Sequence, residues 1–398
     1  MTTALRDPDL QTDAAMRGTN QIGMRAQNER VVLSLLRRHG ALAKTDIARM
    51  TGLSLQAASV MMRKLEDDGL LERREKLRGR VGQPLVPMAL APRGAFSFGL
   101  KIGRRSTDLM LVDFLGNSIG IARHTYPYPT PSEVISFVGT ALPKLSALIP
   151  AAEQHRISGI GIAMPFQLWN WAAYVGAPQS EMDAWRQNDI ATDVAEISGL
   201  PAWVQNDATS ACRAELVFGQ ARVPSDFLYV FIAHFIGGGL VLNGRLRTGP
   251  TGNAAAIGSM PVPETGGAMT QLITVGSLAG LERRMIERGQ SAAAIWERAE
   301  DWGVDDDIRA SWIRACAAGI AHATLCATAT AELRAVMIEG WLPADWRADL
   351  AQAVREEIDR LDFSGLDLPA VIEGSIGHLA RTLGAASIPL AQKYLLDA

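Results

Sequence analysis

Residues 41–84 read ALAKTDIARMTGLSLQAASVMMRKLEDDGLLERREKLRGRVGQP, and this stretch determines the character of the front of the chain. Its hydrophobic spacing predicts two short helices joined by a tight turn, followed by a strand and a basic loop. Gly52 permits the turn because glycine takes positive φ freely, and Ser54 is a good N-cap for the second of these helices. This order of elements predicts a winged helix-turn-helix, whose last helix enters a DNA major groove.

A further helix is expected before this pair, and the helix after Ser54 is expected to have two faces. Residues 28–38 place Val32, Leu35 and Leu36 on one helical face, and His39-Gly40 ends that helix. After Ser54, the residues at core spacing are Ala58, Met61 or Met62, and Leu65. The opposite face then presents Gln56, Ser59 and Arg63, with Leu55 and Val60 beside them.

The outward face of that helix carries side chains suited to reading DNA. Glutamine pairs bidentately with adenine, serine reaches a base or a phosphate, and arginine favours guanine or phosphate. In the basic loop, Arg80 follows Gly79 and is expected to enter a narrow A·T minor groove. The predicted DNA contacts are made by Lys44, Ser54, Gln56, Ser59, Arg63, Arg78, Arg80 and Gln83.

The distribution of charge agrees with a double-stranded DNA partner for this segment. Residues 28–84 carry 12 Lys+Arg and 7 Asp+Glu, a net +5, whereas the whole chain is −3 and the remainder therefore −8. Contacts to phosphates require such a local basic excess. The alternative interpretation is a helical protein-interaction module with a solvated basic loop.

Composition sets the broad class of protein. A length of 398 residues predicts two or three domains, and 48% hydrophobic with 20% charged residues is typical of a globular protein. No apolar run is long enough to span a bilayer, and no signal-peptide core is present, so we expect no membrane partner. The three scattered cysteines, Cys212, Cys316 and Cys326, predict a reducing cytoplasm and no disulfide framework.

The larger, C-terminal part alternates strands with helices. The Pro-rich stretch 84–92 is expected to be a connector, and Gly116-Asn117 to be a hairpin turn. Later strands are expected at Ile157–Ala163, Ala202–Val204, Phe227–Ala233, Gly239–Leu242 and Ala335–Glu339. Helices are expected at 205–219, Trp312–Leu333 and Ala386–Leu396. Such alternation predicts an α/β domain with a cleft.

Three places in this part suggest a binding site, and each has a plainer explanation. Asn206-Asp207 joins a strand to a helix, where a carboxylate can act on or bind a sugar hydroxyl, although Asp207 would also serve as a helix N-cap. The glycines of 235–239 suit either a phosphate cradle or, preferably, a tight turn. Trp169, Trp171 and Tyr174 have faces suited to sugar rings, or they pack a surface loop onto the core.

The combined motifs resemble the ROK family of repressors, open reading frames and kinases. The resemblance rests on GLKIG, VDFLG, GIAMP, GLPAWVQNDATSACRAE, FIGGGLVLNGRLRTG, GNAAAIGSM and LGAASIPLAQ, and it spans nearly the whole chain after Gln27. It implies a two-lobed, actin-like (ribonuclease H-like) fold with a ligand between the lobes. For the sugar-responsive regulators of this family, it also implies dimers or tetramers and a palindromic operator.

The chain departs from the kinases of that family at both phosphate motifs. Their first hairpin carries Asp-x-Gly-x-Thr, where this chain has Lys101, Gly103 and Arg105. Their second motif is Gly-Thr-Gly-Ile-Gly, where this chain reads AHFIG at 233–237. Phosphoryl transfer depends on positioning and on metal-assisted neutralisation of charge. We therefore expect no kinase activity and no nucleotide cofactor.

The sugar and zinc motifs of the family are also changed. Asn206 and Asp207 match the family's hydroxyl-binding pair, but Ala256, Ser259 and Gln271 stand where the family has Glu, His and Glu. No cysteine lies in residues 258–277, so we expect no zinc site and no other cofactor. The predicted effector-binding residues are Asn206, Asp207, Gln271, Trp169 and Trp171, for a sugar or a sugar derivative.

These patterns predict a bacterial, nucleoid-associated cytoplasmic regulator of carbohydrate genes, more often a repressor in this family. Residues 1–25 are expected to be a disordered arm, 26–92 the winged helix-turn-helix, and 93–398 the two-lobed domain, with its C-terminal helix returning to the first lobe. Two alternatives are a sugar kinase that retained its DNA-binding head, and a DNA-binding protein whose cleft binds nothing.

Overall fold

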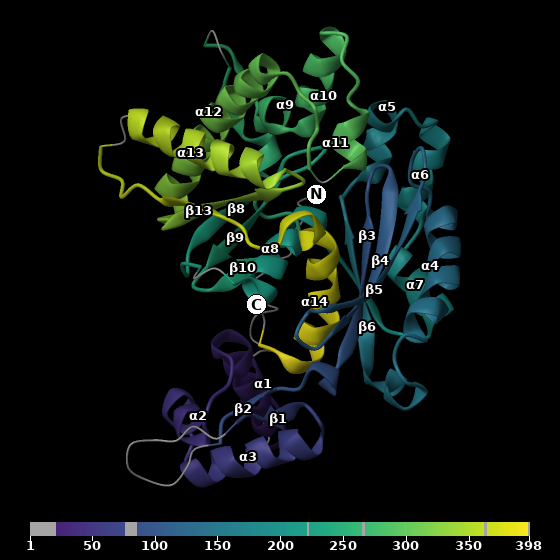
Figure 1. The fold of residues 1–398 in the computed structure, drawn as a ribbon, viewed down its shortest axis with the longest axis vertical. Helices are drawn as coiled ribbons and strands as arrows, with labels where there is room; N and C mark the ends of the chain where they lie inside the picture. Colours follow the sequence, from purple (N-terminus) through teal and green to yellow (C-terminus); the bar gives the residue numbers. More distant parts are fainter. Residues whose placement is uncertain are drawn as a thin grey trace, which may run out of the picture. The chain divides into compact units, whose positions relative to one another are not determined.

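The computed structural model describes residues 21–75, 86–220, 223–264, 267–298, 300–361 and 364–396. They form two compact units (Figure 1). Unit 1 comprises the described residues up to Ala89 together with Tyr394–Leu396, and unit 2 comprises Leu90–Lys393. Across the described ranges, every helix is too short or too polar to cross a membrane.

Unit 1 consists of three helices and a two-stranded sheet. Its elements are α1 (Gln21–His39), α2 (Lys44–Thr51), α3 (Leu55–Asp67), β1 (Leu71–Arg73) and β2 (Met88–Leu90). β1 pairs with β2, and Met88 exchanges two backbone hydrogen bonds with Leu42, of 2.9 and 3.0 Å. Strand β2 therefore pairs both with β1 and with the segment before α2.

The predicted turn and cap of the helix-turn-helix are confirmed. Gly52 has φ 73°, a left-handed conformation that costs glycine little. The Ser54 hydroxyl oxygen accepts a hydrogen bond of 3.1 Å from the backbone N–H of Ala57, which satisfies one donor of the first turn of α3. The core of the unit contains Val32, Leu33, Leu36, Ile47, Ala58, Met61, Met62, Leu65, Leu71 and Met88.

Four sequence-based expectations for unit 1 differ from the structure or fall outside its described part. Helix α1 begins at Gln21, so residues 21–27 extend the helix predicted from residue 28. Leu33 is buried and Leu35 only half-buried, because residue 35 lies about 100° around the helix from residue 36. Residues 88–90 of the expected connector form a strand. Arg78, Arg80 and Gln83 lie outside the described residues.

Unit 2 contains two lobes, each built on a five-stranded sheet. In the first lobe the strand order is β5-β4-β3-β6-β7. Its strands are β3 (Phe96–Ile102), β4 (Ser106–Asp113), β5 (Ser118–Thr125), β6 (Ile157–Met164) and β7 (Ala202–Asn206). Its helices are α4 (Pro131–Ser146), α5 (Ala172–Val175), α6 (Gln179–Gln187) and α7 (Ile190–Ser198), with short 3-10 turns η2 (Pro92–Gly94), η3 (Ala151–Arg156) and η4 (Leu168–Trp171).

The second lobe repeats this plan with the order β10-β9-β8-β13-β14. Its strands are β8 (Phe227–Ile232), β9 (Gly237–Leu242), β10 (Arg245–Arg247), β13 (Ala335–Gly340) and β14 (Ala370–Glu373), with a separate pair β11 (Pro261–Pro263) and β12 (Met269–Gln271). Its helices are α8 (Asp207–Phe218), α9 (Leu272–Gly276), α10 (Leu278–Glu287), α11 (Ala293–Glu297), α12 (Asp306–Ala331) and α13 (Ala344–Arg360), with η5 (Ile257–Ser259).

The two sheets share one topology, which defines the fold class. In each sheet a meander of three antiparallel strands is followed by two parallel strands, because β3 and β8 pair in parallel with β6 and β13 respectively. This duplication is the two-lobed, actin-like (ribonuclease H-like) arrangement that the resemblance implied. Helices α4 and α7 cover the outer face of the first sheet, and α12 and α13 cover that of the second (Figure 1).

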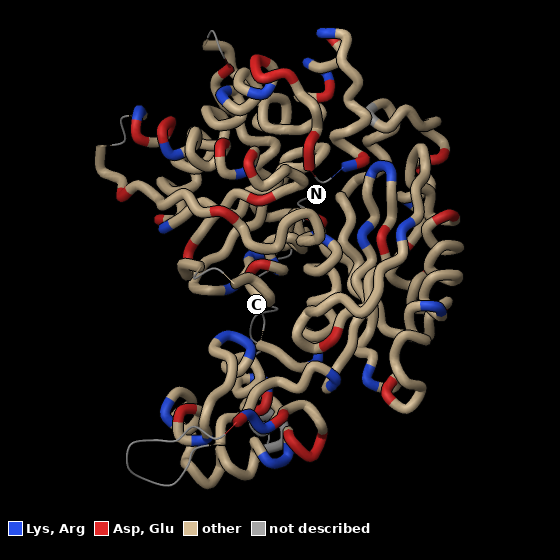
Figure 2. The backbone as a smooth tube through the Cα atoms, in the orientation of Figure 1, with Lys and Arg blue, Asp and Glu red and all other residues tan. Residues whose placement is uncertain are grey.

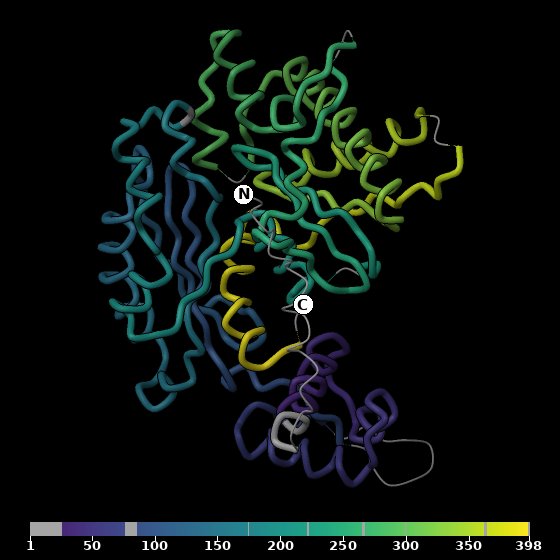
Figure 3. Tube along the Cα trace, turned by 180° about the vertical axis from the view of Figure 1, so that it is seen from behind, coloured from purple at the N-terminus to yellow at the C-terminus, as the bar shows by residue number. Residues whose placement is uncertain are grey.

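The last helix, α14 (Ala380–Tyr394), follows η6 (Gly377–Leu379) and runs between the two lobes, as both views show (Figures 1 and 3). The helix begins six residues earlier than predicted from the sequence. Glycines allow its backbone to approach both neighbours: a Cβ on Gly161 of β6 would overlap the carbonyl oxygen of Ala385, and one on Gly384 would overlap that of Ser210 in α8. Ser97 donates a hydrogen bond of 2.6 Å to the carbonyl oxygen of Ala386.

The glycine triplet 237–239 forms neither a phosphate cradle nor a tight turn. It begins strand β9, which pairs antiparallel with β8. Its role is packing against α8, since a Cβ on Gly237 would lie 2.7 Å from the Cβ of Ala208, and one on Gly239 would overlap Cys212. Three consecutive glycines therefore mark a close helix-on-sheet contact here, which sequence spacing alone does not distinguish from a turn.

We predict that Gly161→Ala destabilises unit 2 by at least about 2 kcal/mol, because the added methyl forces α14 away from β6. Gly139→Ala is the matched control: Gly139 is exposed in α4 with nothing within 4 Å of an added Cβ. That change should stabilise the protein by about 0.5–1 kcal/mol. The midpoints of denaturant unfolding measure both effects, and equal midpoints for the two variants would contradict the described packing of α14.

Candidate functional site

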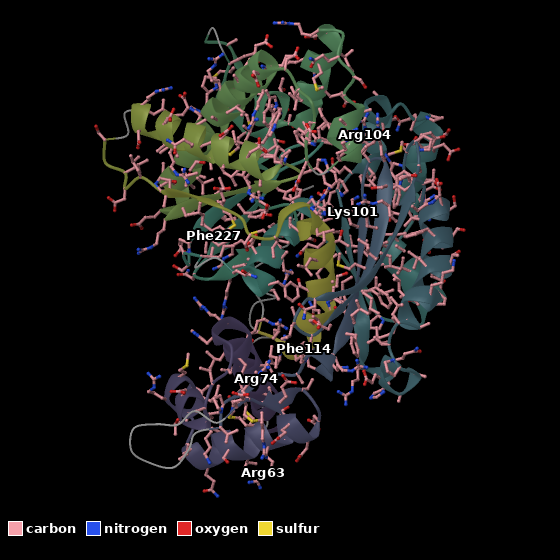
Figure 4. All side chains as sticks on the ribbon, in the orientation of Figure 1. Arg63, Arg74, Lys101, Arg104, Phe114 and Phe227 are labelled. Carbon is pink, nitrogen blue, oxygen red and sulfur yellow. The ribbon has the colours of Figure 1, made fainter. Side chains whose placement is uncertain are left out.

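The outward face of α3 carries the side chains that the sequence analysis predicted to read DNA. Gln56 and Arg63 are exposed and Ser59 is half-buried, while the four predicted core residues of α3 are buried. Lys44 and Ser54 are exposed at the starts of α2 and α3. Lys44 and Arg63 form no ion pair with the residues that the structure describes, and Arg63 is labelled on α3 in Figure 4.

Several other basic groups of unit 1 are held by carboxylates. Arg73 of β1 makes two hydrogen bonds to the Glu66 carboxylate, with Nε–Oε1 2.7 Å and Nη2–Oε2 3.1 Å. Lys64 lies 2.7 Å from Glu29, and Arg74 lies 3.0 Å from Glu72. The net charge of this segment therefore overstates the number of cations that are free to meet phosphates.

A cleft of about 1180 Å³ opens within unit 2, between the two lobes. All five residues predicted to bind an effector line it: Asn206, Asp207, Gln271, Trp169 and Trp171. They come from both lobes, because η4 supplies the tryptophans, the β7–α8 junction supplies the Asn-Asp pair, and β12 supplies the glutamine. Ala256 and Ser259 line the same cleft.

The Asn206-Asp207 pair divides two tasks. Asn206, and not Asp207, is the N-cap of α8, since its Oδ1 accepts hydrogen bonds of 3.1 and 3.2 Å from the N–H groups of Ala208 and Thr209. Asp207 is the first residue of the helix, and its Oδ2 lies 3.3 Å from Nη1 of Arg381. The Asp207 carboxylate therefore has two partners, because its Oδ1 also accepts a hydrogen bond of 3.0 Å from the backbone N–H of Ala208.

Arg381 is a cleft residue that the sequence analysis missed. It lies in the first turn of α14, lines the cleft, and places its guanidinium 5.3 Å from the ring centroid of Phe231. Its partner Asp207 is 174 positions away in the chain. Only the folding of α14 between the lobes brings the two together, so no local pattern could have indicated the pair.

The tryptophans belong both to the cleft and to the packing of their loop. Trp171 meets Phe235 of the second lobe edge-to-face, with ring centroids 5.0 Å apart. Trp169 lies beneath the guanidinium of Arg186 at 5.6 Å, and its carbonyl oxygen accepts a hydrogen bond from Gln179. Both rings also pack against the core of the first lobe. The two interpretations of this aromatic cluster are thus compatible.

Lys101 is buried in the first lobe and does not line the cleft. Its ammonium group lies 3.0 Å from Asp108 and 2.9 Å from the Ser106 hydroxyl, and Asp108 also pairs with Arg123. Burial lowers the pKa of Lys101 to about 8, opposed by the attraction of Asp108. In Figure 2, a red acidic segment lies between two blue basic segments on the neighbouring strands β3, β4 and β5. Figure 4 labels Lys101.

A polar cluster that lines the cleft joins the two lobes. Arg104, which follows β3, donates a hydrogen bond of 3.1 Å to Nδ1 of His234 and lies 3.7 Å from Glu282 of α10. Trp296 donates a 3.1 Å hydrogen bond to Glu282. Burial, with the nearby Arg104, lowers the pKa of His234 to about 3. His234 is therefore neutral at pH 7 with its proton on Nε2.

Comparison with known proteins assigns the family. The ROK family model matches residues 97–392, and the chain belongs to the ROK family. A winged helix-turn-helix DNA-binding model matches residues 25–72. The helix-turn-helix match lies in unit 1, and the ROK match lies in unit 2.

Individual relatives agree with this membership. An uncharacterized protein, y4fQ, of Sinorhizobium fredii is 24% identical over 93% of this chain and 92% of its own length. A xylose repressor of Bacillus spizizenii is 22% identical over 62% of this chain; the match spans 63% of the repressor, less than two thirds of its length. A solved ROK family transcriptional regulator, homologous to the E. coli MLC protein, superposes with a TM-score of 0.66 at 18% identity, covering 93% of this chain and 96% of that one.

We predict that His234 makes the protein sensitive to acid. Its pKa is about 3 in the folded protein and about 6.5 in an unfolded chain, so the unfolded chain binds an extra proton between these values. Stability therefore rises with pH across this window and falls on acidification, by up to about 1.4 kcal/mol per pH unit from this group.

His234→Asn, which keeps an acceptor for Arg104, should flatten the pH dependence of the unfolding midpoint between about pH 4 and 6.5. His155→Asn, at an exposed position in η3, is the matched control and should leave the profile unchanged. Parallel profiles for wild type and His234→Asn would refute the assignment.

Proposed function

We propose that this protein is a DNA-binding transcription regulator, acting as a repressor of carbohydrate uptake or catabolism genes under the control of a sugar or sugar-derivative effector. One observation carries the proposal: a single chain joins an outward-facing recognition helix to a two-lobed cleft. The match to a winged helix-turn-helix DNA-binding model supports the first half. The similarity to a protein named xylose repressor supports the second.

The regulator acts as a homodimer, or a dimer of dimers, on nucleoid DNA in the bacterial cytoplasm. A dimer places two α3 helices about one helical turn of DNA apart, which requires a palindromic operator. Gln56, Ser59 and Arg63 of each α3 contact base edges, while Lys44, Ser54 and the wing residues Arg78, Arg80 and Gln83 contact the backbone or the minor groove.

DNA binding should respond differently to substitutions in these groups. Gln56→Ala should change the preferred base at one half-site position, and Arg63→Ala should cost about 1–3 kcal/mol and relax the base preference at another. Arg80→Ala should weaken binding most at A·T-rich flanks. Fluorescence anisotropy with the upstream region of its own gene measures these effects, with Arg360→Ala in the exposed C-terminal turn of α13 as control.

A uniform loss of affinity for all three variants, without a change in base preference, would refute the assignment of grooves. If the wild-type protein causes no increase in the anisotropy of this DNA at moderate salt, the proposed DNA binding is refuted.

Backbone strain supports a working ligand site in the cleft. Gln167 and Ala255 line the cleft from opposite lobes, and each has φ 58°, a conformation that non-glycine residues rarely adopt. Such strain clusters at ligand clamps and switch regions. The cleft thus retains the features of a binding site, although Ala256 and Ser259 lack the strong hydrogen-bonding groups that the family has there.

Helix α14 is the element that transmits the effect of a bound ligand from the cleft to the DNA-binding unit. Its first turn holds Arg381 against Asp207 in the cleft. The residues that follow the helix belong to unit 1, where Arg30 of α1 donates a hydrogen bond to the Leu395 carbonyl and Ser34 accepts one from Leu396. A ligand hydroxyl that hydrogen-bonds to Asp207 competes with Arg381 and so weakens the ion pair that holds the start of α14. An effector that binds more tightly to one position of α14 than to another shifts the equilibrium between them.

A ligand that fits the cleft should raise the melting temperature, since binding at 100 times Kd stabilises the folded state by about 2.7 kcal/mol. The screen uses monosaccharides, polyols and sugar phosphates. Gln271→Ala should reduce the shift, whereas Gln352→Ala, exposed on α13 and outside the cleft, should preserve it. If no compound shifts either protein, the alternative of a DNA-binding protein with an empty cleft is favoured.

The second candidate function is a sugar kinase that retained its DNA-binding head. Asp207 in the cleft favours it, as the residue that would accept a proton from a sugar hydroxyl. Lys101, Arg104 and His234 oppose it, because these bulky and cationic groups occupy the positions of the kinase phosphate motifs. Turnover of ATP with a hexose in a coupled assay, abolished by Asp207→Asn, would establish the kinase instead.

A further inference from the structure

Among residues 26–75 and 86–89 of unit 1, large apolar side chains are exposed at three positions. They are Met50, Leu55 and Val60, with 39%, 49% and 57% of their surface exposed. Leu55 and Val60 lie on α3, whose other large apolar residues are in the core or half-buried. Leu55 and Val60 are therefore accessible to a partner that binds the exposed side of α3.

The two side chains flank the polar strip of α3. At about 100° per residue, and with Leu55 at zero, Ser59 lies near 40°, Arg63 near 80°, Gln56 near 100° and Val60 near 140°. The buried residues of the helix, Ala58, Met61, Met62 and Leu65, lie between about 240° and 340° on the same scale. Leu55 and Val60 therefore border the same face that carries the hydrogen-bonding groups, separated by about 7.5 Å along the axis, roughly two base-pair steps.

The charges around this face favour DNA over a protein partner. The first turn of α3 contains no acidic residue, and the carboxylate of Glu66 is occupied by Arg73. Arg63, in the centre of the strip, is exposed and makes no ion pair with described residues. A cationic strip bordered by apolar groups matches a major groove, where thymine alone presents a methyl group among polar base edges.

We propose that Leu55 and Val60 read thymine by contacting its 5-methyl group in the major groove of the operator half-site. This inference rests on the proposed DNA-binding function and adds to it a second mode of base recognition, independent of hydrogen bonds. It assigns Leu55 to a base pair at one end of the sequence that α3 reads and Val60 to a base pair about two steps away.

The test removes one methyl at a time from the DNA. A binding site is first selected with the full-length protein from a random duplex pool, and each thymine of the half-site is then replaced by deoxyuridine. Deoxyuridine keeps every hydrogen-bonding group of thymine and lacks only the methyl. We expect wild-type affinity to fall about fourfold at one or two positions, the value for one buried methyl-sized group.

Leu55→Ala and Val60→Ala should each abolish the deoxyuridine effect at one position and leave the effect at the other. Met50→Ala, an exposed apolar residue of α2, is the matched control and should leave both effects intact. Because all three side chains are exposed, the variants should keep the wild-type melting temperature, which is measured alongside.

The possible results distinguish failure of the proposed methyl contacts from failure of the proposed DNA-binding function. Sensitivity to deoxyuridine that both variants leave unchanged, or no sensitivity at any thymine, would overturn the methyl contacts while DNA binding stands. Full-length protein that selects no duplex from the pool would overturn the proposed function itself. Unchanged DNA affinity in both variants would show that neither side chain contacts the DNA and would likewise overturn the proposal.

Discussion

Close contact between the backbone of α14 and its neighbours is the constraint on which unit 2 depends. A helix lies this near to a strand only where no side chain intervenes, and Gly161 of β6 and Gly384 of α14 remove the side chains at these points. Ser97 fixes the register through its hydrogen bond to Ala386. Because the helix is fixed in this way, Arg381 lies next to Asp207, and both side chains line the cleft.

Local patterns predicted unit 1 well because its structure is set by short-range chemistry. A left-handed glycine at position 52, a serine cap at position 54 and the spacing of Ala58, Met61, Met62 and Leu65 each act within a turn or two of helix. The errors in this unit have the same local origin. Nothing in residues 21–27 stops a helix, and Leu33 and Leu35 are both apolar neighbours of the predicted face, so only packing distinguishes them.

Some of the residues that line the cleft could be predicted from the sequence, and others could not. The motif resemblance indicated Asn206, Asp207 and Gln271, and the aromatic cluster indicated Trp169 and Trp171; the structure places all five residues in one cleft. Arg381, His234 and Glu282 were not identified as members of this site, because each is defined by a partner far away in the sequence. The glycines 237–239 were misinterpreted for a related reason: their packing partner, α8, precedes them by a strand and a loop.

The Lys101–Asp108–Arg123 arrangement bears on how this lobe can change through evolution. Asp108 is buried, and two cations neutralise it. A carboxylate introduced at position 101 would replace one of those cations with a second buried negative charge beside Asp108. An acidic side chain at this position therefore destabilises the lobe unless a neighbouring residue changes with it.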